Sequence, residues 1–228
     1  ITGGTDDPGD KDPDYSGEVT LFAPMGNQNT YLIDSEGEIV HSWQSSKGPA
    51  LAAYMLDDKT LLRCTSPGQQ NQAFSGGGGG GKIERFDWDG NLIWEFEYSS
   101  DSYILHHDIE YLPNGNVLMI AWEKKSEVEA IAAGRDPSKL SDGEIWSEKI
   151  IEVQPDGSNG GTIVWEWHAW DHLVQEFDAT KPNYGVVSEQ PGKINLNFTN
   201  QQAKADWIHI NSIDYNEELG QIILTPRN

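Results

Sequence analysis

Cysteine and long apolar stretches are scarce in this chain of 228 residues. Cys64 is its one cysteine, so an intrachain disulfide is excluded. Its apolar neighbours Leu61 and Leu62 predict that the thiol is buried and inert. No apolar run reaches the ~18 residues that a membrane-spanning helix needs. The sequence also has no GxxxxGK(S/T) loop and no GxSxG motif, so we expect neither a nucleotide cofactor nor a serine nucleophile.

Positively charged residues are also few. The chain has 15 Lys and Arg residues against 37 Asp and Glu residues, which gives a formal net charge of −22. Such a surface repels phosphates and anionic lipid headgroups, and this argues against nucleic acid and anionic membranes as partners. Solubility, for example in a salty medium, is the simplest reason for the acidity.

The first residues lack any periodic pattern. Residues 1–17 are rich in Gly, Asp and Pro, so we expect a flexible acidic lead-in before a folded domain over residues 18–228. The chain begins with Ile1 rather than Met, and such a lead-in is typical after a cleaved signal or a lipid anchor. Alternating aspartates in this segment resemble a calcium loop. The glycine and final glutamate of an EF-hand are not in place, which favours a solvated linker.

The rest of the chain repeats two kinds of hairpin. In the first kind, an acidic residue followed by glycine makes the turn and a tryptophan lies near the end. Its copies span residues 31–43, 83–94 and 151–165. Copies of the second kind cover residues 53–62, 108–120 and 210–224. Two successive hairpins make the four-stranded antiparallel sheet that forms one blade of a β-propeller.

The sequence therefore predicts an all-β fold, namely a β-propeller of about three blades with short helical insertions. A propeller closes with about four to eight blades. We therefore expect an incomplete ring, because the chain is truncated or because other copies complete it as a homo-oligomer. The insertions are the glycine run 76–81, a helix over residues 126–133 ended by Gly134, and a long excursion over residues 171–206.

Two histidines stand at the start of the second kind of hairpin. His107 immediately precedes the strand in the second copy, and His209 opens the third. These strands would be the innermost of their blades, so we expect the two imidazoles to converge near the axis around a small oxyanion. The alternative is that each imidazole only caps its strand by bonding nearby backbone. Alternation points His106 away from His107, which makes His106 the weaker of the pair.

Other candidates surround these strands. Arg227 could bind an oxyanion beside the imidazoles, although a surface arginine at a strand end fits the spacing equally well. His168 and His172 have the i, i+4 spacing of helical metal sites, but no third ligand is evident and we expect no metal. We expect His41 to have a structural role. Most nearby aromatic residues would pack in the blades, and a few could stack on a planar ring. These aromatic residues are Trp122, Trp165, Trp167, Trp170, Tyr184 and Trp207.

Three stretches of this sequence resemble the bacterial arylsulfate sulfotransferases. They are residues 106–118, which begin His-His-Asp-Ile-Glu-Tyr, residues 165–172, and residues 206–211, which read Asp-Trp-Ile-His-Ile-Asn. Residues 31–43 and 83–94 are similar to early blade strands of that family. The resemblance spans about residues 18–228.

The resemblance implies a six-bladed propeller that is periplasmic, at the cell surface or extracellular. It implies transfer of a sulfuryl group from an aryl sulfate ester to a phenol, without a nucleotide donor and through a sulfated histidine. The catalytic residues would be His107, His209 and Arg227, and the last two have the family's spacing of eighteen residues. The substrate-binding candidates are His106, His172, Trp170, Trp207 and Asn211.

Two departures accompany this resemblance. The histidine that becomes sulfated in the family lies further towards the C-terminus than Asn228, so we expect this chain to bind but not to turn over. Pro226 precedes the arginine where family members usually have serine. The competing interpretations are a propeller that kept the fold as a non-catalytic binding protein, and a surface scaffold protein whose lead-in is a tether.

Overall fold

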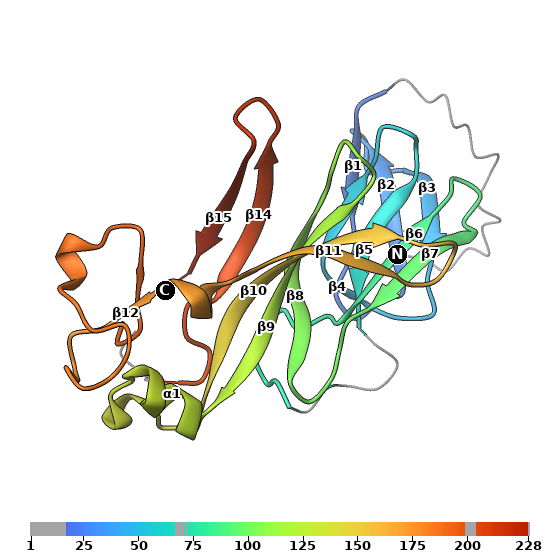
Figure 1. The fold of residues 1–228 in the computed structure, drawn as a ribbon. Helices are drawn as coiled ribbons and strands as arrows, with labels where there is room; N and C mark the ends of the chain where they lie inside the picture. The colour runs from blue at the N-terminus through green and yellow to red at the C-terminus, as the bar shows by residue number, and fades with distance from the viewer. Residues whose placement is uncertain (1–16, 67–70, 72, 199–203, 228) are drawn as a thin grey trace.

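The computed structural model describes residues 17–66, 71, 73–198 and 204–227, so the expected acidic lead-in lies almost wholly outside the described residues. The fold is all-β, as predicted, and consists mainly of antiparallel sheets (Figure 1). Within the described residues, no helix is long and apolar enough to span a bilayer.

The predicted hairpins all form, and they join into successive sheets. The first sheet has three strands: β1 (Val19–Phe22), β2 (Asn29–Asp34) and β3 (Ile39–Gln44). The second contains β4 (Pro49–Met55), β5 (Leu61–Thr65), β6 (Lys82–Phe86) and β7 (Leu92–Glu97). The third contains β8 (Tyr103–Tyr111), β9 (Val117–Ser126), β10 (Glu144–Pro155) and β11 (Gly161–His168). The hairpin of β14 (Ile210–Asn216) and β15 (Gln221–Pro226) follows.

The helical insertion and the long excursion lie at one end of the molecule, away from the first two sheets, whereas the glycine run connects β5 to β6 within the second sheet (Figure 1). Helix α1 (Glu127–Ala133) forms where expected, because Ser126 caps its first turn and Gly134 ends it in the left-handed conformation. The long excursion contains the short parallel strands β12 (Leu173–Val174) and β13 (Ile194–Asn195). The elements of the described residues also include three 3-10 turns, at Pro137–Lys139, Ala169–His172 and Val187–Glu189.

The core consists of apolar layers between neighbouring sheets. Leu32, Trp43, Leu61 and Phe86 fill the first layer. Leu62, Ile83, Leu105, Ile109 and Met119 belong to the second, which also buries Cys64 as predicted. Leu118, Ile120, Ile150 and Ile213 lie in the third, under the β14–β15 hairpin. Sheets stacked face to face in chain order are the arrangement of propeller blades, and a closed ring stays a prediction.

A repeated hydrogen bond ties each sheet to the next. The indole of Trp43 donates to the carbonyl of Asp87 at 2.8 Å, and the indole of Trp94 donates to the carbonyl of Gly160 at 2.8 Å. Both acceptors lie in the turn of the following sheet's outer hairpin. The tryptophans at the ends of the first two outer hairpins therefore fix the spacing between each of these sheets and the next.

The innermost strands β4, β8 and β14 lie side by side, with β8 in the middle. Asp108 on β8 joins all three. One carboxylate oxygen accepts the hydroxyl of Tyr54 on β4 at 2.6 Å, and the other accepts the backbone N–H of Ile213 on β14 at 3.1 Å. This carboxylate sets the spacing of the inner strands directly beside His107.

Candidate functional site

The inner strands share an unusual backbone conformation at one end. Leu51 in β4, His107 in β8 and His209 just before β14 all have positive φ angles, of 78°, 54° and 58°. Each lies at or next to a break in strand register. Positive φ is costly for a residue with a side chain and persists only where the surrounding structure imposes it. The fold therefore turns the backbone at this point of each repeat, and in two repeats the turned residue is histidine.

The glycine run 76–81 supports the turned segment of β8. The N–H of His107 donates to the carbonyl of Gly78 at 2.9 Å, and the N–H of Gly80 donates to the carbonyl of Leu105 at 2.9 Å. Gly78 has a φ of +83°, and a Cβ atom there would overlap the imidazole of His107. A Cβ at Gly76 would overlap Trp122 in the same way. These glycines let the backbone approach rings that no larger residue could approach.

His107 and His209 come together as the sequence predicted. Their ring centroids lie 4.6 Å apart and the rings meet edge to face at 76°. The ring of His106 stacks on Trp122 at 3.9 Å and lies 6.4 Å from His209. Alternation was expected to separate His106 from His107, but the register break in β8 brings their Nδ1 atoms to 3.0 Å. The result is a cluster of three imidazoles over one indole.

Acidic side chains hold two of these imidazoles. The Nδ1 atom of His209 lies 2.6 Å from a carboxylate oxygen of Asp206. The Nε2 atom of His106 lies 2.9 Å from Glu148, and both of these side chains are fully buried. The other oxygen of Glu148 accepts the backbone N–H of Ile210 at 3.0 Å. Both rings therefore have fixed orientations.

Burial shifts the pKa values of His106, His107 and Glu148. It lowers the pKa of His107 to about 4, aided by His106, His209 and the charge of Arg227. It lowers the pKa of His106 well below its usual value, and it raises the pKa of Glu148 to about 8 against the hydrogen bond from Ile210. Near neutral pH, His106 and His107 are therefore uncharged and can act as hydrogen-bond donors, bases or nucleophiles.

Arg227 reaches the cluster from β15. Its backbone N–H donates to the carbonyl of His209 at 2.8 Å, so the two residues are paired across the hairpin. Arg227 lines a polar cleft of about 430 Å³. The other lining residues include Gly76, Gly77, Asp142, Glu144, Trp146, Lys204 and Asp206. The cleft therefore brings the guanidinium of Arg227 and the ammonium group of Lys204 together with three carboxylates, and none of the three clustered imidazoles is among its lining residues.

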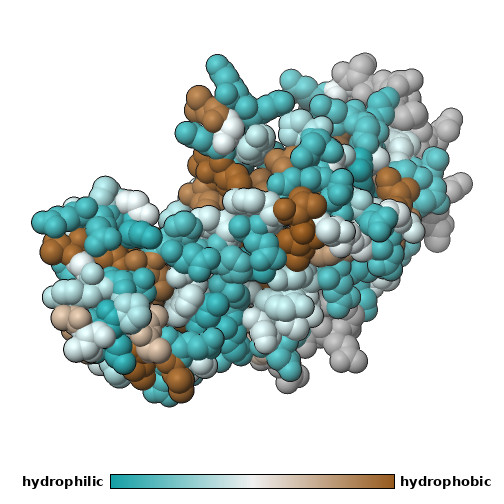
Figure 2. Space-filling model, viewed as in Figure 1, coloured by the Kyte–Doolittle hydropathy of each residue, from teal (hydrophilic) through white to brown (hydrophobic). Residues whose placement is uncertain are grey.

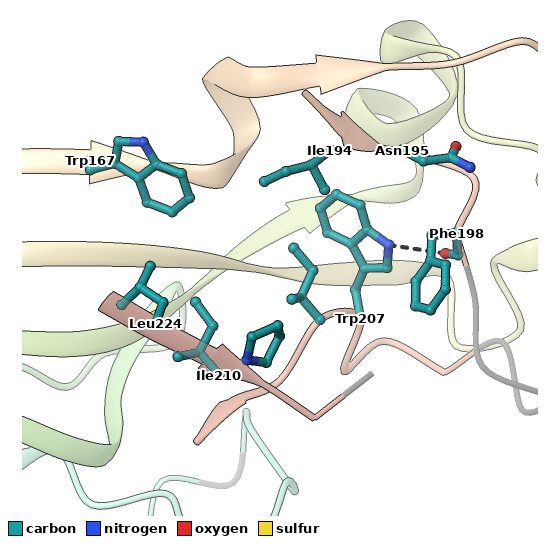
Figure 3. A pocket seen from close by; sticks show the side chains of 9 residues that line it. Trp167, Ile194, Asn195, Phe198, Trp207, Ile210 and Leu224 are labelled. Atoms are coloured by element: carbon teal, nitrogen blue, oxygen red, sulfur yellow. Dashed lines mark hydrogen bonds between the residues drawn. The ribbon is translucent and has the colours of Figure 1, made fainter. Parts of the chain in front are cut away.

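The other substrate-binding candidates lie elsewhere. Trp207 lines an apolar pocket of about 420 Å³, where its indole donates to the carbonyl of Phe198 at 3.0 Å (Figure 3). Ile208 and Ile210, on either side of His209 in the sequence, line this pocket, whereas His209 belongs to the imidazole cluster. Figure 2 shows hydrophobic side chains gathered at the base of the β14–β15 hairpin, beside this hollow. The structure thus separates Trp207 from the imidazoles.

Three further candidates also lie outside the cluster. His172 stacks on Trp167 at 5.2 Å, and Trp167 is part of the apolar pocket. The ammonium group of Lys125 lies over the ring of Trp170, 5.5 Å from the ring centroid. Asn211 is exposed at the register break of β14. Their assignment to substrate binding stays a prediction.

The remaining histidines have local partners. His168 contacts Glu123 and Glu166 at 3.1 Å each, and His172 does not share these contacts. Within the described ranges, no group of three or more His, Cys, Asp or Glu side chains is arranged to hold a metal ion. His41 is buried and stacks on Trp88 at 4.0 Å in the first core layer.

Sequence reasoning missed Glu148, Asp206, Trp146 and the reason for the glycine run. Asp206 could have been found, because an acidic residue three positions before a histidine can fix its ring. Glu148 gave no signal, since both faces of β10 are buried and its neighbours do not alternate. Six successive glycines indicated close approach of backbone to another group, although not which group.

The fold and site define an all-β protein of stacked antiparallel sheets with a histidine cluster at the ends of its inner strands. The profile of the arylsulfotransferase (ASST) family matches residues 8–228. The chain belongs to this family. No curated protein matches the chain.

One solved structure that is similar to this chain is that of a protein of unknown function from Bacteroides caccae. It is 12% identical with a TM-score of 0.43, and the match covers 90% of this chain and 48% of that one. The chain therefore spans about half the length of the solved protein that it matches.

Proposed function

We propose that this chain supplies the oxyanion-binding half of a nucleotide-independent arylsulfotransferase. The reaction would move a sulfuryl group from an aryl sulfate ester to a phenol through a sulfated histidine. The observation that carries this proposal is the edge-to-face contact of His107 and His209, 4.6 Å apart, beside the cleft that Arg227 lines. Membership of the family supports the same reaction class.

The three side chains have complementary roles in such a transfer. The guanidinium of Arg227 offers two parallel N–H donors to the sulfuryl oxygens, which gain negative charge as the S–O bond to the aryl group breaks. His107 can present its Nε2–H to the same oxygens, or to the departing phenoxide oxygen, which needs a proton. The Nδ1 atom of His209 faces the carboxylate of Asp206, so His209 can donate from Nε2 only when both of its ring nitrogens carry a proton. Donors fixed before the reaction stabilise the developing charge without further reorganisation.

The cleft also offers a surface for an aromatic ring. Trp146 lines the same cleft as Arg227, and its indole N–H donates to the carboxylate of Glu144 at 2.7 Å. An aryl group stacked on this indole would place its sulfate towards the guanidinium. Trp146 therefore replaces Trp207 as the best candidate for an aromatic contact, because Trp207 faces a different pocket.

The covalent step needs a nucleophilic histidine. We propose that it belongs to a longer protein in which this chain is one part, since the family resemblance expects it beyond Asn228. We also propose a periplasmic, cell-surface or extracellular location, as the resemblance implies.

The test is an assay of the longer protein with 4-nitrophenyl sulfate as donor and phenol as acceptor. The expected result is release of 4-nitrophenolate that depends on phenol, together with a histidine labelled by sulfur-35 from a labelled donor. Arg227→Gln should abolish both, and Lys181→Gln, in the excursion and outside the cleft, is the control. No release and no labelled histidine would refute the enzyme and favour a non-catalytic binding or scaffold protein.

A further inference from the structure

Glu148, His106 and His107 form a continuous chain of hydrogen-bonding atoms that ends at the site. Glu148 contacts His106 Nε2 at 2.9 Å, and His106 Nδ1 contacts His107 Nδ1 at 3.0 Å. The side chains of Glu148 and His106 are buried. His107 is partly exposed, and its Nδ1 is the atom that faces His106. Its other ring nitrogen, Nε2, is therefore the one that remains for a ligand.

The hydrogen-bond donor and acceptor roles of Glu148, His106 and His107 are linked. A neutral imidazole has one donor nitrogen and one acceptor nitrogen. When Glu148 is protonated, it donates to His106 Nε2, so His106 Nδ1 carries its proton and donates to His107 Nδ1. His107 then carries its proton on Nε2. When Glu148 is a carboxylate, every role reverses, and His107 Nε2 presents a lone pair.

We propose that Glu148 is a positioning residue that sets, through His106, which ring nitrogen of His107 carries the proton. This inference rests on the proposed function and extends it. As the sulfur forms a bond to the nucleophilic histidine of the longer protein, its bond to the aryl oxygen breaks, and the Nε2 proton of His107 passes to the phenoxide oxygen. The Nδ1 proton of His106 passes to His107, and the proton of Glu148 passes to His106. One proton leaves Glu148 and one phenol forms, while neither imidazole of the relay gains a net charge.

The surroundings favour this neutral relay over an ion pair between His106 and Glu148. His106 stacks on Trp122 inside the protein, where an imidazolium would lose its hydration. The charged and titratable groups that face the relay are His209, Asp206 and Arg227. Burial raises the pKa of Glu148 to about 8, so the proton is available near neutral pH. The Ile210 N–H on the second oxygen fixes which oxygen faces His106.

Glu148→Gln locks the relay in one state. The amide oxygen can accept the Ile210 N–H, which leaves the amide NH₂ to donate to His106 Nε2. His107 should then keep its proton on Nε2 at every pH. In the unaltered chain it should shift from Nε2 to Nδ1 as the pH rises through the range where Glu148 ionises.

The measurement is the pair of ¹⁵N chemical shifts of the His107 ring in histidine-labelled protein, followed from pH 5.5 to 9.5 without substrate. His107→Asn assigns the signals. Glu123→Gln is the matched control, because Glu123 also pairs with a histidine, His168, outside the cluster. The expected result is a tautomer shift in the unaltered chain and in Glu123→Gln, and none in Glu148→Gln.

A His107 tautomer that is constant in the unaltered chain would overturn the relay, and so would an equal shift in Glu148→Gln. If Glu148→Gln does not fold, His106→Gln interrupts the same relay and should also abolish the shift. The tautomer measurement needs no turnover. It can therefore refute the relay even if the sulfotransferase assay succeeds, and it can support the relay even if that assay shows no activity.

Discussion

His107 and His209 lie 4.6 Å apart although 101 residues separate them in the sequence, and each has a positive φ at the same structural position of its repeat. The two imidazoles are thus presented by equivalent backbone turns on neighbouring inner strands. The repeat of the fold, rather than any local motif, builds the pair.

Removing either imidazole should weaken anion binding. Asparagine tolerates positive φ, so His107→Asn and His209→Asn keep the backbone turn while they delete the ring. Loss of one hydrogen bond to a charged ligand costs about 1.5–3 kcal/mol, which predicts a roughly ten- to hundredfold rise in the dissociation constant for 4-nitrophenyl sulfate. Isothermal titration calorimetry on this chain measures it. His172→Asn, outside the cluster, should bind normally, and equal affinity in all four proteins would contradict the placement.

Asp108 should be important for stability rather than for binding. Asp108→Ala leaves the buried N–H of Ile213 without its acceptor, and this costs about 1–3 kcal/mol in the free energy of unfolding. Tyr54→Phe removes only the hydroxyl bond to the same carboxylate and should cost about 1 kcal/mol. Urea unfolding followed by tryptophan fluorescence gives both values. A smaller loss for Asp108→Ala than for Tyr54→Phe would show that the tie to β14 does not hold.

The hairpins and the meeting of His107 with His209 could be predicted, because turn residues and repeats are local signals in the sequence. The position of Trp207 could not. It is two residues before His209, so simple alternation would put both on one face. The segment before β14 is irregular and His209 has positive φ, which breaks that alternation. Glu148 could not be predicted either, since its partners come from β8 and β14 and depend on how the sheets stack.

The glycine run offers a test of close packing at the site. Gly78→Ala adds a methyl group that overlaps the His107 ring and imposes positive φ on alanine. We expect a loss of about 1–3 kcal/mol in the free energy of unfolding and weaker aryl sulfate binding. Gly77→Ala is the matched control for stability, because its Cβ would meet nothing within 4 Å; Gly77 lines the cleft, so this variant is not a control for binding. Thermal unfolding of both variants and the same titration compare them. Similar melting temperatures would mean that the run does not pack on His107 as described.

Acid should destabilise the protein partly through His107. Above about pH 6.5 this imidazole is neutral in both the folded and the unfolded chain, so it contributes no pH dependence. Below that pH the unfolded chain binds a proton, whereas the folded chain does not until its lowered pKa of about 4. The contribution of His107 to the free energy of unfolding should therefore fall as the pH drops from 6.5 to 4.

The pKa of His106 is also lowered, so His106 adds to this fall. Glu148 acts in the opposite direction, because its pKa is raised from the ordinary value of about 4.5 to about 8. Its contribution to stability decreases as the pH rises through that range. Comparison with His107→Asn isolates the contribution of His107, because the other groups remain. Urea unfolding at pH 7, 6, 5 and 4.5 should show a shallower decline in the variant than in the unaltered chain. His172→Asn, which removes a histidine outside the cluster, should keep the steeper decline. Parallel curves for the unaltered chain and His107→Asn would mean that His107 takes up its proton as readily in the folded chain as in the unfolded one, and the neutral imidazole at the site would then be wrong.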